Sequence, residues 1–196
     1  MSFLDNPKTA GTAFEIVGLL EVIGGIFAII GGIIDEEIDT GFAVVVGIGA
    51  IICGLIVFFF GAKVLKGQIS AKIDILATFV RVVGVTSIIS GIFLLIGMFM
   101  TSGDIVGPII SIVIGLIIVF ISTKINDGKQ TTGDKIIWIL LLIFFILDLI
   151  GAILTIIGGF NPFSITQIIT GICSVIIYIF MLILLFDSDV KKEMGM

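Results

Sequence analysis

Four ionisable side chains fall inside long apolar stretches of this chain, where a charge is costly: Glu15, Glu21, Arg81 and Asp148. An ionised group at the centre of a bilayer costs roughly 2.5 to 3.5 kcal/mol on insertion scales, so each of these residues needs a structural or functional reason. Two carboxyl groups at the same depth can share one proton, because desolvation and mutual repulsion both oppose the second ionisation. Glu21 and Asp148 are therefore the candidates for proton or cation chemistry.

The same residues also have a structural interpretation, which we favour. An alignment of internal repeats places Glu21, Ser87 and Asp148 at equivalent positions, and it aligns Glu15 with Arg81. The first interpretation is that Glu21 and Asp148 are protonated and hydrogen-bonded to a helix backbone or to Ser87 and Thr155. Glu15 and Arg81 then form an ion pair or extend towards the membrane surface. Contact with an unidentified ligand is the remaining alternative.

Other common kinds of site are missing from the sequence. The chain has no histidine, and its two cysteines, Cys53 and Cys173, lie in separate apolar runs, where we interpret them as packing residues rather than as a disulfide. No motif has the spacing of a metal site, of a phosphate-binding loop or of a nucleophile beside a base. We therefore expect no catalytic residue, no cofactor and no bound metal, and we do not expect an enzyme.

The composition places these residues in a membrane protein. Of the 196 residues, 59% are hydrophobic and only 13% are charged, against roughly 25% charged in an ordinary globular chain. A helix needs about 20 apolar residues to cross a bilayer, and the apolar runs do not alternate in polarity as barrel strands would. We predict an all-α polytopic membrane protein. Its six transmembrane helices are expected at Thr12–Ile34, Gly41–Ala62, Ile75–Met100, Ile105–Ser122, Ile136–Gly158 and Ser164–Phe186.

The lysines predict the orientation of these helices, because positive charge in short loops stays on the cytoplasmic side. They lie before the first span, in the second and fourth connections and after the sixth span: Lys8, Lys63, Lys66, Lys72, Lys124, Lys129, Lys135, Lys191 and Lys192. The other three connections, at 35–40, 101–104 and 160–163, contain none. We therefore predict that both termini are cytoplasmic.

The ends of the spans carry local signals. Asn6 followed by Pro7 is typical of a helix start, which would add an interfacial turn before the first span. No basic segment and small-residue cleavage site precede this span, so we expect it to be retained as an anchor. The only tryptophan, Trp138, begins the fifth span, where an aromatic anchor at the interface is typical.

The glycines indicate an internal repeat. Gly24–Gly25, Ser90–Gly91 and Gly151–Ala152 align in the odd spans, and Gly54, Gly115 and Gly171 align in the even spans. We predict three tandem helical hairpins, at 9–67, 75–128 and 136–188, arranged with pseudo-threefold symmetry about the membrane normal within one membrane domain, 1–196. The first two spans carry glycines every seven residues, which permits close helix packing in lipid: Gly11, Gly18, Gly25 and Gly32, and Gly47, Gly54 and Gly61.

The hairpin pattern resembles that of a known family. A glycine-bearing first helix (residues 22–31) followed by a second helix with a central glycine (residues 49–56) is similar to the HdeD-like acid-resistance membrane proteins. Family members commonly have a proline in an outer turn, which only Pro162 matches, and the acidic first outer connection departs from the pattern. The resemblance implies a cytoplasmic-membrane protein linked to acid stress, without an established enzymatic activity.

Two functions remain open on these grounds. The first is a non-catalytic structural or stress-related role, as a self-associating protein or as a small subunit of a larger membrane complex. The alternative is a proton- or cation-conducting channel or transporter that uses Glu21 and Asp148. A lipid-modifying enzyme would require a cluster of polar side chains at the interface, which the sequence lacks. The expected partners are the lipid bilayer and either a homo-oligomer or a larger membrane complex, and no nucleic acid is implied.

Overall fold

The computed structural model describes residues 6–34, 39–127, 132–160 and 163–196. Six of its helices are long and apolar enough to cross a membrane, which agrees with the prediction of a multi-pass all-α membrane protein. A short seventh helix, which the apolar pattern does not predict, follows them. The helices are α1 (Pro7–Ile34), α2 (Thr40–Leu65), α3 (Lys72–Thr101), α4 (Val106–Ile125), α5 (Thr132–Gly158), α6 (Ile165–Phe186) and α7 (Ser188–Glu193).

Polar side chains cap several helices just beyond the apolar runs. Asn6 precedes α1 and accepts a hydrogen bond from the backbone N–H of Lys8 at 3.0 Å, as the sequence predicts for this end. Asp39 accepts from the N–H of Phe42 at 2.7 Å at the start of α2. These caps satisfy backbone donors that have no partner within the helix, so most helices extend a few residues past the apolar spans.

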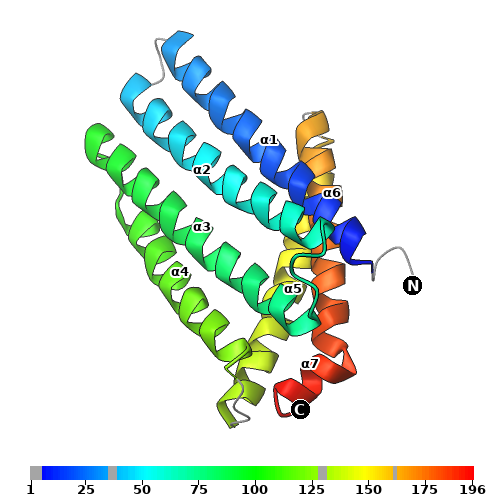
Figure 1. Ribbon diagram of the computed structural model, residues 1–196. Helices are drawn as coiled ribbons and strands as arrows, with labels where there is room; N and C mark the ends of the chain where they lie inside the picture. The colour runs from blue at the N-terminus through cyan, green and yellow to red at the C-terminus, as the bar shows by residue number, and fades with distance from the viewer. Residues whose placement is uncertain (1–5, 35–38, 128–131, 161–162) are drawn as a thin grey trace.

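The six long helices run up and down alternately (Figure 1). The starts of α1, α3 and α5, the ends of α2, α4 and α6, and α7 lie towards one end of the molecule, and the opposite ends of the six long helices lie towards the other. The described lysines all belong to the first end, which we call the lysine-bearing end. Three groups of predicted loop residues lie outside the described residues: the acidic residues 35–38, residues 128–131 with Lys129, and residues 161–162 with Pro162.

Helices α1 and α2 pack backbone to backbone along the glycine faces that the sequence predicts. A Cβ atom at Gly18 would lie 2.5 Å from both the carbonyl oxygen of Gly54 and the backbone nitrogen of Phe58. One at Gly25 would lie 2.6 Å from the carbonyl oxygen of Gly47. Because helices gain little from hydrophobic burial against each other in lipid, this close van der Waals contact accounts for much of their association.

The second hairpin uses the same geometry and packs against the first. Gly84 of α3 lies against Gly115 of α4, at positions that the repeat alignment matches to Gly18 and Gly54. Between the hairpins, the ring of Phe93 on α3 packs over Gly49 of α2. Helices α1 to α4 therefore form one closely packed body.

The third hairpin has a different register. Gly171 of α6 packs against the backbone of Ala152 of α5, whereas the alignment matches Gly171 to Gly54 and would pair it with Phe145. The shift is 152 − 145 = 7 residues, or about two helical turns. Phe145 stands where the other hairpins have Gly18 and Gly84, and its ring cannot fit between two touching backbones. The α5–α6 contact therefore moves along to the smaller Ala152.

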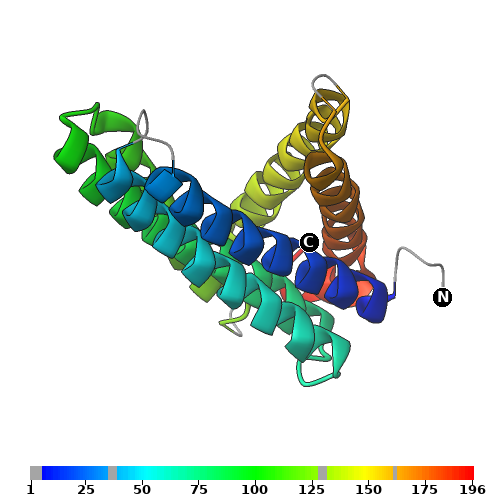
Figure 2. The same cartoon turned by 90° about the horizontal axis from the view of Figure 1, so that it is seen from above.

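The predicted pseudo-threefold arrangement is not confirmed. In Figure 2, the α5–α6 hairpin diverges from the body formed by α1 to α4 and approaches it near the lysine-bearing end. An aromatic cluster joins the three hairpins: the ring of Phe79 on α3 lies 5.3 Å from Phe14, 6.0 Å from Phe145 and 6.2 Å from Tyr178. The interior is therefore densest around this cluster, and α1 and α6 separate beyond it.

Candidate functional site

Glu21 lies at the middle of α1, as the fifteenth of its 28 residues (21 − 7 + 1 = 15). Its half-buried side chain lines a groove of about 570 Å³ between α1 and α6, together with Thr166 and Thr170 near the start of α6. No hydrogen bond or ion pair joins Glu21 to any other described residue.

Asp148 occupies a comparable position on α5, but its surroundings differ. Its carboxyl group lies beside the phenol of Tyr178 on α6. The expected hydrogen bonds from Ser87 and Thr155 to this carboxyl group are not formed within the described residues, and the Thr155 hydroxyl donates to the carbonyl oxygen of Gly151 at 2.9 Å. Within the described residues, Asp148 and Glu21 do not interact, so a directly shared proton is not supported.

A cavity of about 120 Å³ lies at the centre of the bundle, between α1, α2, α3 and α6. Its polar lining comes from Thr86, Ser174 and Tyr178, and its other walls are aliphatic and aromatic. The Thr86 hydroxyl bonds to its own helix, 3.0 Å from the carbonyl oxygens of Val82 and Val83. A cavity of this size and polarity is suited to ordered water, which needs two or more polar partners. Tyr178 borders this cavity and also contacts Asp148.

The remaining intramembrane candidates are not gathered into a site. Glu15 is half-buried on α1, and Arg81 is exposed on α3. The expected ion pair between them is not formed in the part of the chain that the structure describes. Ser87 has a packing role, since its carbonyl oxygen accepts a hydrogen bond from the hydroxyl of Ser111 on α4 at 3.2 Å.

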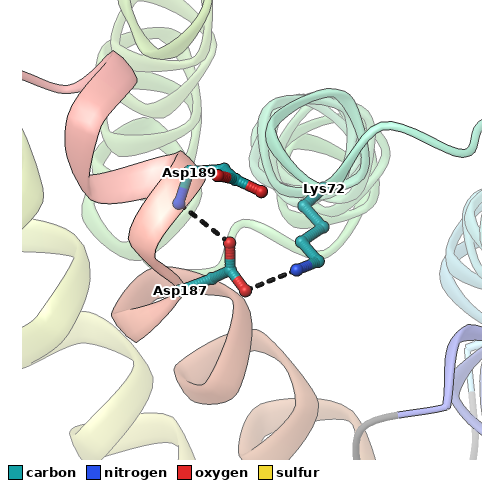
Figure 3. Close-up of polar contacts among 3 residues, drawn as sticks. All are labelled: Lys72, Asp187 and Asp189. Atoms are coloured by element: carbon teal, nitrogen blue, oxygen red, sulfur yellow. Dashed lines mark hydrogen bonds and ion pairs between the residues drawn. The ribbon is translucent and has the colours of Figure 1, made fainter.

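A polar cluster at the lysine-bearing end attaches α7 to α3 (Figure 3). The Lys72 ammonium donates a hydrogen bond to the Asp187 carboxylate, which also accepts from the backbone N–H of Asp189 at 3.0 Å. This ammonium holds the pKa of the Asp187 carboxyl below its usual range. Asp187 thus caps α7 and pairs with α3, while Val190 and Met194 are buried beside it.

Trp138 is buried rather than placed as an anchor at the interface. Its indole N–H donates to the carbonyl oxygen of Leu185 at 2.9 Å, in the last turn of α6 where carbonyls lack helical partners. Its ring meets Phe186 edge to face with centroids 5.4 Å apart, and the Lys191 ammonium lies 5.8 Å from the Trp138 ring centroid. Trp138 therefore joins the start of α5 to the end of α6.

Sequence reasoning missed three residues that the structure brings to the carboxyl groups: Tyr178, Thr166 and Thr170. Tyr178 is the only tyrosine in the chain and lies inside an apolar span, which was a usable signal. The two threonines lie four residues apart, on one face of a helix, near the start of the sixth span. Which helix this face meets could not be read from the spacing.

Comparisons of the chain with protein-family models, with curated proteins and with solved structures found no match. The resemblance to HdeD-like proteins therefore stays a prediction that rests on the hairpin pattern.

Proposed function

We propose that this protein is a non-catalytic membrane protein that associates with a second copy of itself through α5. The observation that carries the proposal is an exposed face of α5 that contains glycines without a packing partner in the described chain. The resemblance to HdeD-like proteins supports a role in acid stress and a location in the cytoplasmic (plasma) membrane. The one-sided lysines support an orientation with both termini inside.

The exposed face of α5 has the pattern of a helix-pairing seam. Leu140, Leu147 and Leu154 recur every seven residues and are 47%, 61% and 60% exposed. Gly151 and Gly158 lie between and beyond them at spacings of three and four, and a Cβ atom at either glycine would meet nothing within 4 Å. We call these five residues the α5 seam. Spacings of three and four keep one stripe of a helix against a partner helix.

Glycine on such a stripe favours a protein partner over lipid. Elsewhere in the bundle, glycines such as Gly18 and Gly84 allow two backbones to touch. Facing acyl chains, a glycine provides no side-chain contact and lowers helix propensity by roughly 1 kcal/mol relative to alanine. A second copy is the simplest partner, because the seam is uncharged and a twofold contact places the same stripe on both sides.

The test is the oligomeric state of the full-length protein in lipid nanodiscs and mild detergent. We expect the unmodified protein to be a dimer and the double variant Gly151→Leu, Gly158→Leu to be a monomer. Because a Cβ atom added at either glycine would meet nothing within 4 Å, the monomer of the double variant should keep its thermal stability. Gly107→Leu on α4, where a Cβ atom also meets nothing, is the matched control and should remain dimeric. An unmodified protein that is monomeric at every concentration contradicts the proposal.

Proton or cation conduction is the second candidate, and the central cavity is the observation that favours it. Ser174 and Tyr178 line this cavity, and Tyr178 also lies beside Asp148. Water in the cavity would therefore be linked to the Asp148 carboxyl group through the Tyr178 phenol. Reconstituted liposomes should then show proton or cation flux that Asp148→Asn and Tyr178→Phe abolish. Absence of flux in the unmodified protein would remove this candidate and leave self-association standing.

A further inference from the structure

The groove between α1 and α6 has the size of a small-molecule site. Its volume of about 570 Å³ lies within the usual range of about 300 to 1,000 Å³ for ligand pockets. Its walls are mainly apolar and include Val17, Ile23 and Phe27 of α1. Its lining residues on α6, Thr166 and Thr170, belong to the end of the third hairpin that diverges from the rest of the bundle (Figure 2). A molecule dissolved in the hydrocarbon of the membrane would therefore reach it from the side.

The polar groups of the groove favour a ligand that donates hydrogen bonds. Glu21 presents a carboxyl group, and the structure gives it no hydrogen bond within the described chain. The Thr170 hydroxyl lies in the same groove, while that of Thr166 is 3.2 Å from the hydroxyl of Ser164. A protonated amine can donate to a carboxylate and to a hydroxyl together, and the pair removes the cost of an isolated charge in the membrane.

The shape of the groove adds to this charge complementarity. A Cβ atom at Gly24 would meet nothing within 4 Å, so the α1 backbone is open to close approach one turn beyond Glu21. The Phe27 ring lies further along the same wall, where its face can receive an alkyl chain or a cation. The headgroup of a lipid stays at the membrane surface because its phosphate is charged. A neutral lipophilic amine can enter the hydrocarbon, reach Glu21 at the middle of α1 and take the proton of its carboxyl group, which leaves an ammonium paired with a carboxylate. A freely diffusing lipophilic amine is the better fit.

We propose that the groove between α1 and α6 is a binding site for lipophilic amines, in which the ligand ammonium pairs with Glu21 and its apolar part lies against Val17, Ile23 and Phe27. The site is separate from the α5 seam, so it does not depend on the proposed self-association. It assigns to Glu21 a ligand-pairing role that Asp148, which already has Tyr178 as a partner, does not share.

The test uses decylamine with a photoreactive diazirine in its alkyl tail, added to the full-length protein in lipid nanodiscs. Irradiation followed by peptide mapping should place the label on residues 17–27 and 166–170. Unlabelled decylamine should compete, and decanol should compete roughly tenfold or more weakly, because it lacks the charge-assisted hydrogen bond to Glu21. Glu21→Gln should abolish this preference for the amine. Glu15→Gln, on the same helix but outside the groove, should retain it.

A second variant keeps the proposal testable if Glu21→Gln does not fold. Gly24→Leu places a side chain in the groove without a clash inside the protein, so it should block labelling by the amine while the thermal stability is preserved. Three results would overturn the proposal: equal competition by decylamine and decanol, unchanged labelling of a folded Glu21→Gln or Gly24→Leu protein, and label spread evenly over all lipid-facing helices. The last would indicate simple partitioning of the amine into the bilayer.

Discussion

Single small residues decide how the helices of this protein meet. Gly18 and Gly84 allow backbone contact with Gly54 and Gly115, so the first two hairpins share one register. Phe145 takes the equivalent position in α5, and there the contact with α6 moves by two turns. The aromatic ring of Phe145 thus accounts for the different register of the third hairpin. The glycines that remain open, such as Gly24, are the ones that line the groove or face outward.

Replacing a packed glycine should therefore cost far more than replacing an open one. In Gly18→Ala, the new methyl group would lie 2.5 Å from backbone atoms of α2, which cannot move aside as a flexible side chain can. We expect this variant to lose about 1 to 3 kcal/mol of stability, as overpacked cores do. Gly24→Ala on the same helix should be neutral or slightly stabilising, since alanine favours helix. Thermal unfolding in detergent measures both, and equal losses would contradict the packing described for α1 and α2.

At the scale of elements, polar groups at the lysine-bearing end attach α7 to the rest of the molecule. Asp187 caps α7 and pairs with Lys72 of α3, and Trp138 of α5 bonds to the last turn of α6. These contacts join α3, α5, α6 and α7 at the lysine-bearing end. They explain why the third hairpin stays attached there although it diverges at the opposite end.

The Lys72–Asp187 pair should make the attachment of α7 dependent on pH. A carboxyl group whose pKa is lower in the folded protein than in the unfolded chain stabilises the fold above its usual pKa of about 4. That contribution is lost as the pH falls through the folded value. Lys72→Met should therefore lower stability at pH 7 by about 0.5 kcal/mol, because the pair is partly exposed and screened by solvent.

Fluorescence of Trp138, the only tryptophan, can follow denaturant unfolding of this region. The difference between the unmodified protein and Lys72→Met should be present at pH 7 and be lost as the pH falls through the pKa of Asp187 in the folded protein, which lies below its usual value. Lys63→Met removes the same charge from the last turn of α2 and serves as the control. A difference that persists at acid pH would show that Lys72 acts through packing alone.

At the scale of the whole molecule, the alternating path of six helices gathers the described lysines at one end. If this end is cytoplasmic, as the distribution of positive charge predicts, cysteines placed at the two ends should differ in accessibility. Thr101 at the end of α3 and Gln68 in the α2–α3 connection are both exposed and lie at opposite ends. The native Cys53 and Cys173 are buried free thiols, so the background should be low.

A membrane-impermeant maleimide applied to intact cells should label Thr101→Cys and leave Gln68→Cys unlabelled until the cells are permeabilised. The reverse pattern would show an inverted orientation. Labelling of both variants in intact cells would contradict a single orientation across the membrane.

The sequence by itself determined the number of spans, their helical state, the gathering of lysines at one end and the glycine faces of α1 and α2. These follow from hydropathy and local spacing, since every backbone group in lipid must find its partner within its own helix. Only the tertiary structure decided that Tyr178 meets Asp148, that Glu21 faces a groove and that the third hairpin packs in a different register from the other two. Those outcomes depend on the volumes of side chains that are distant in sequence, such as Phe145. An alignment of the spans with one another does not take these volumes into account.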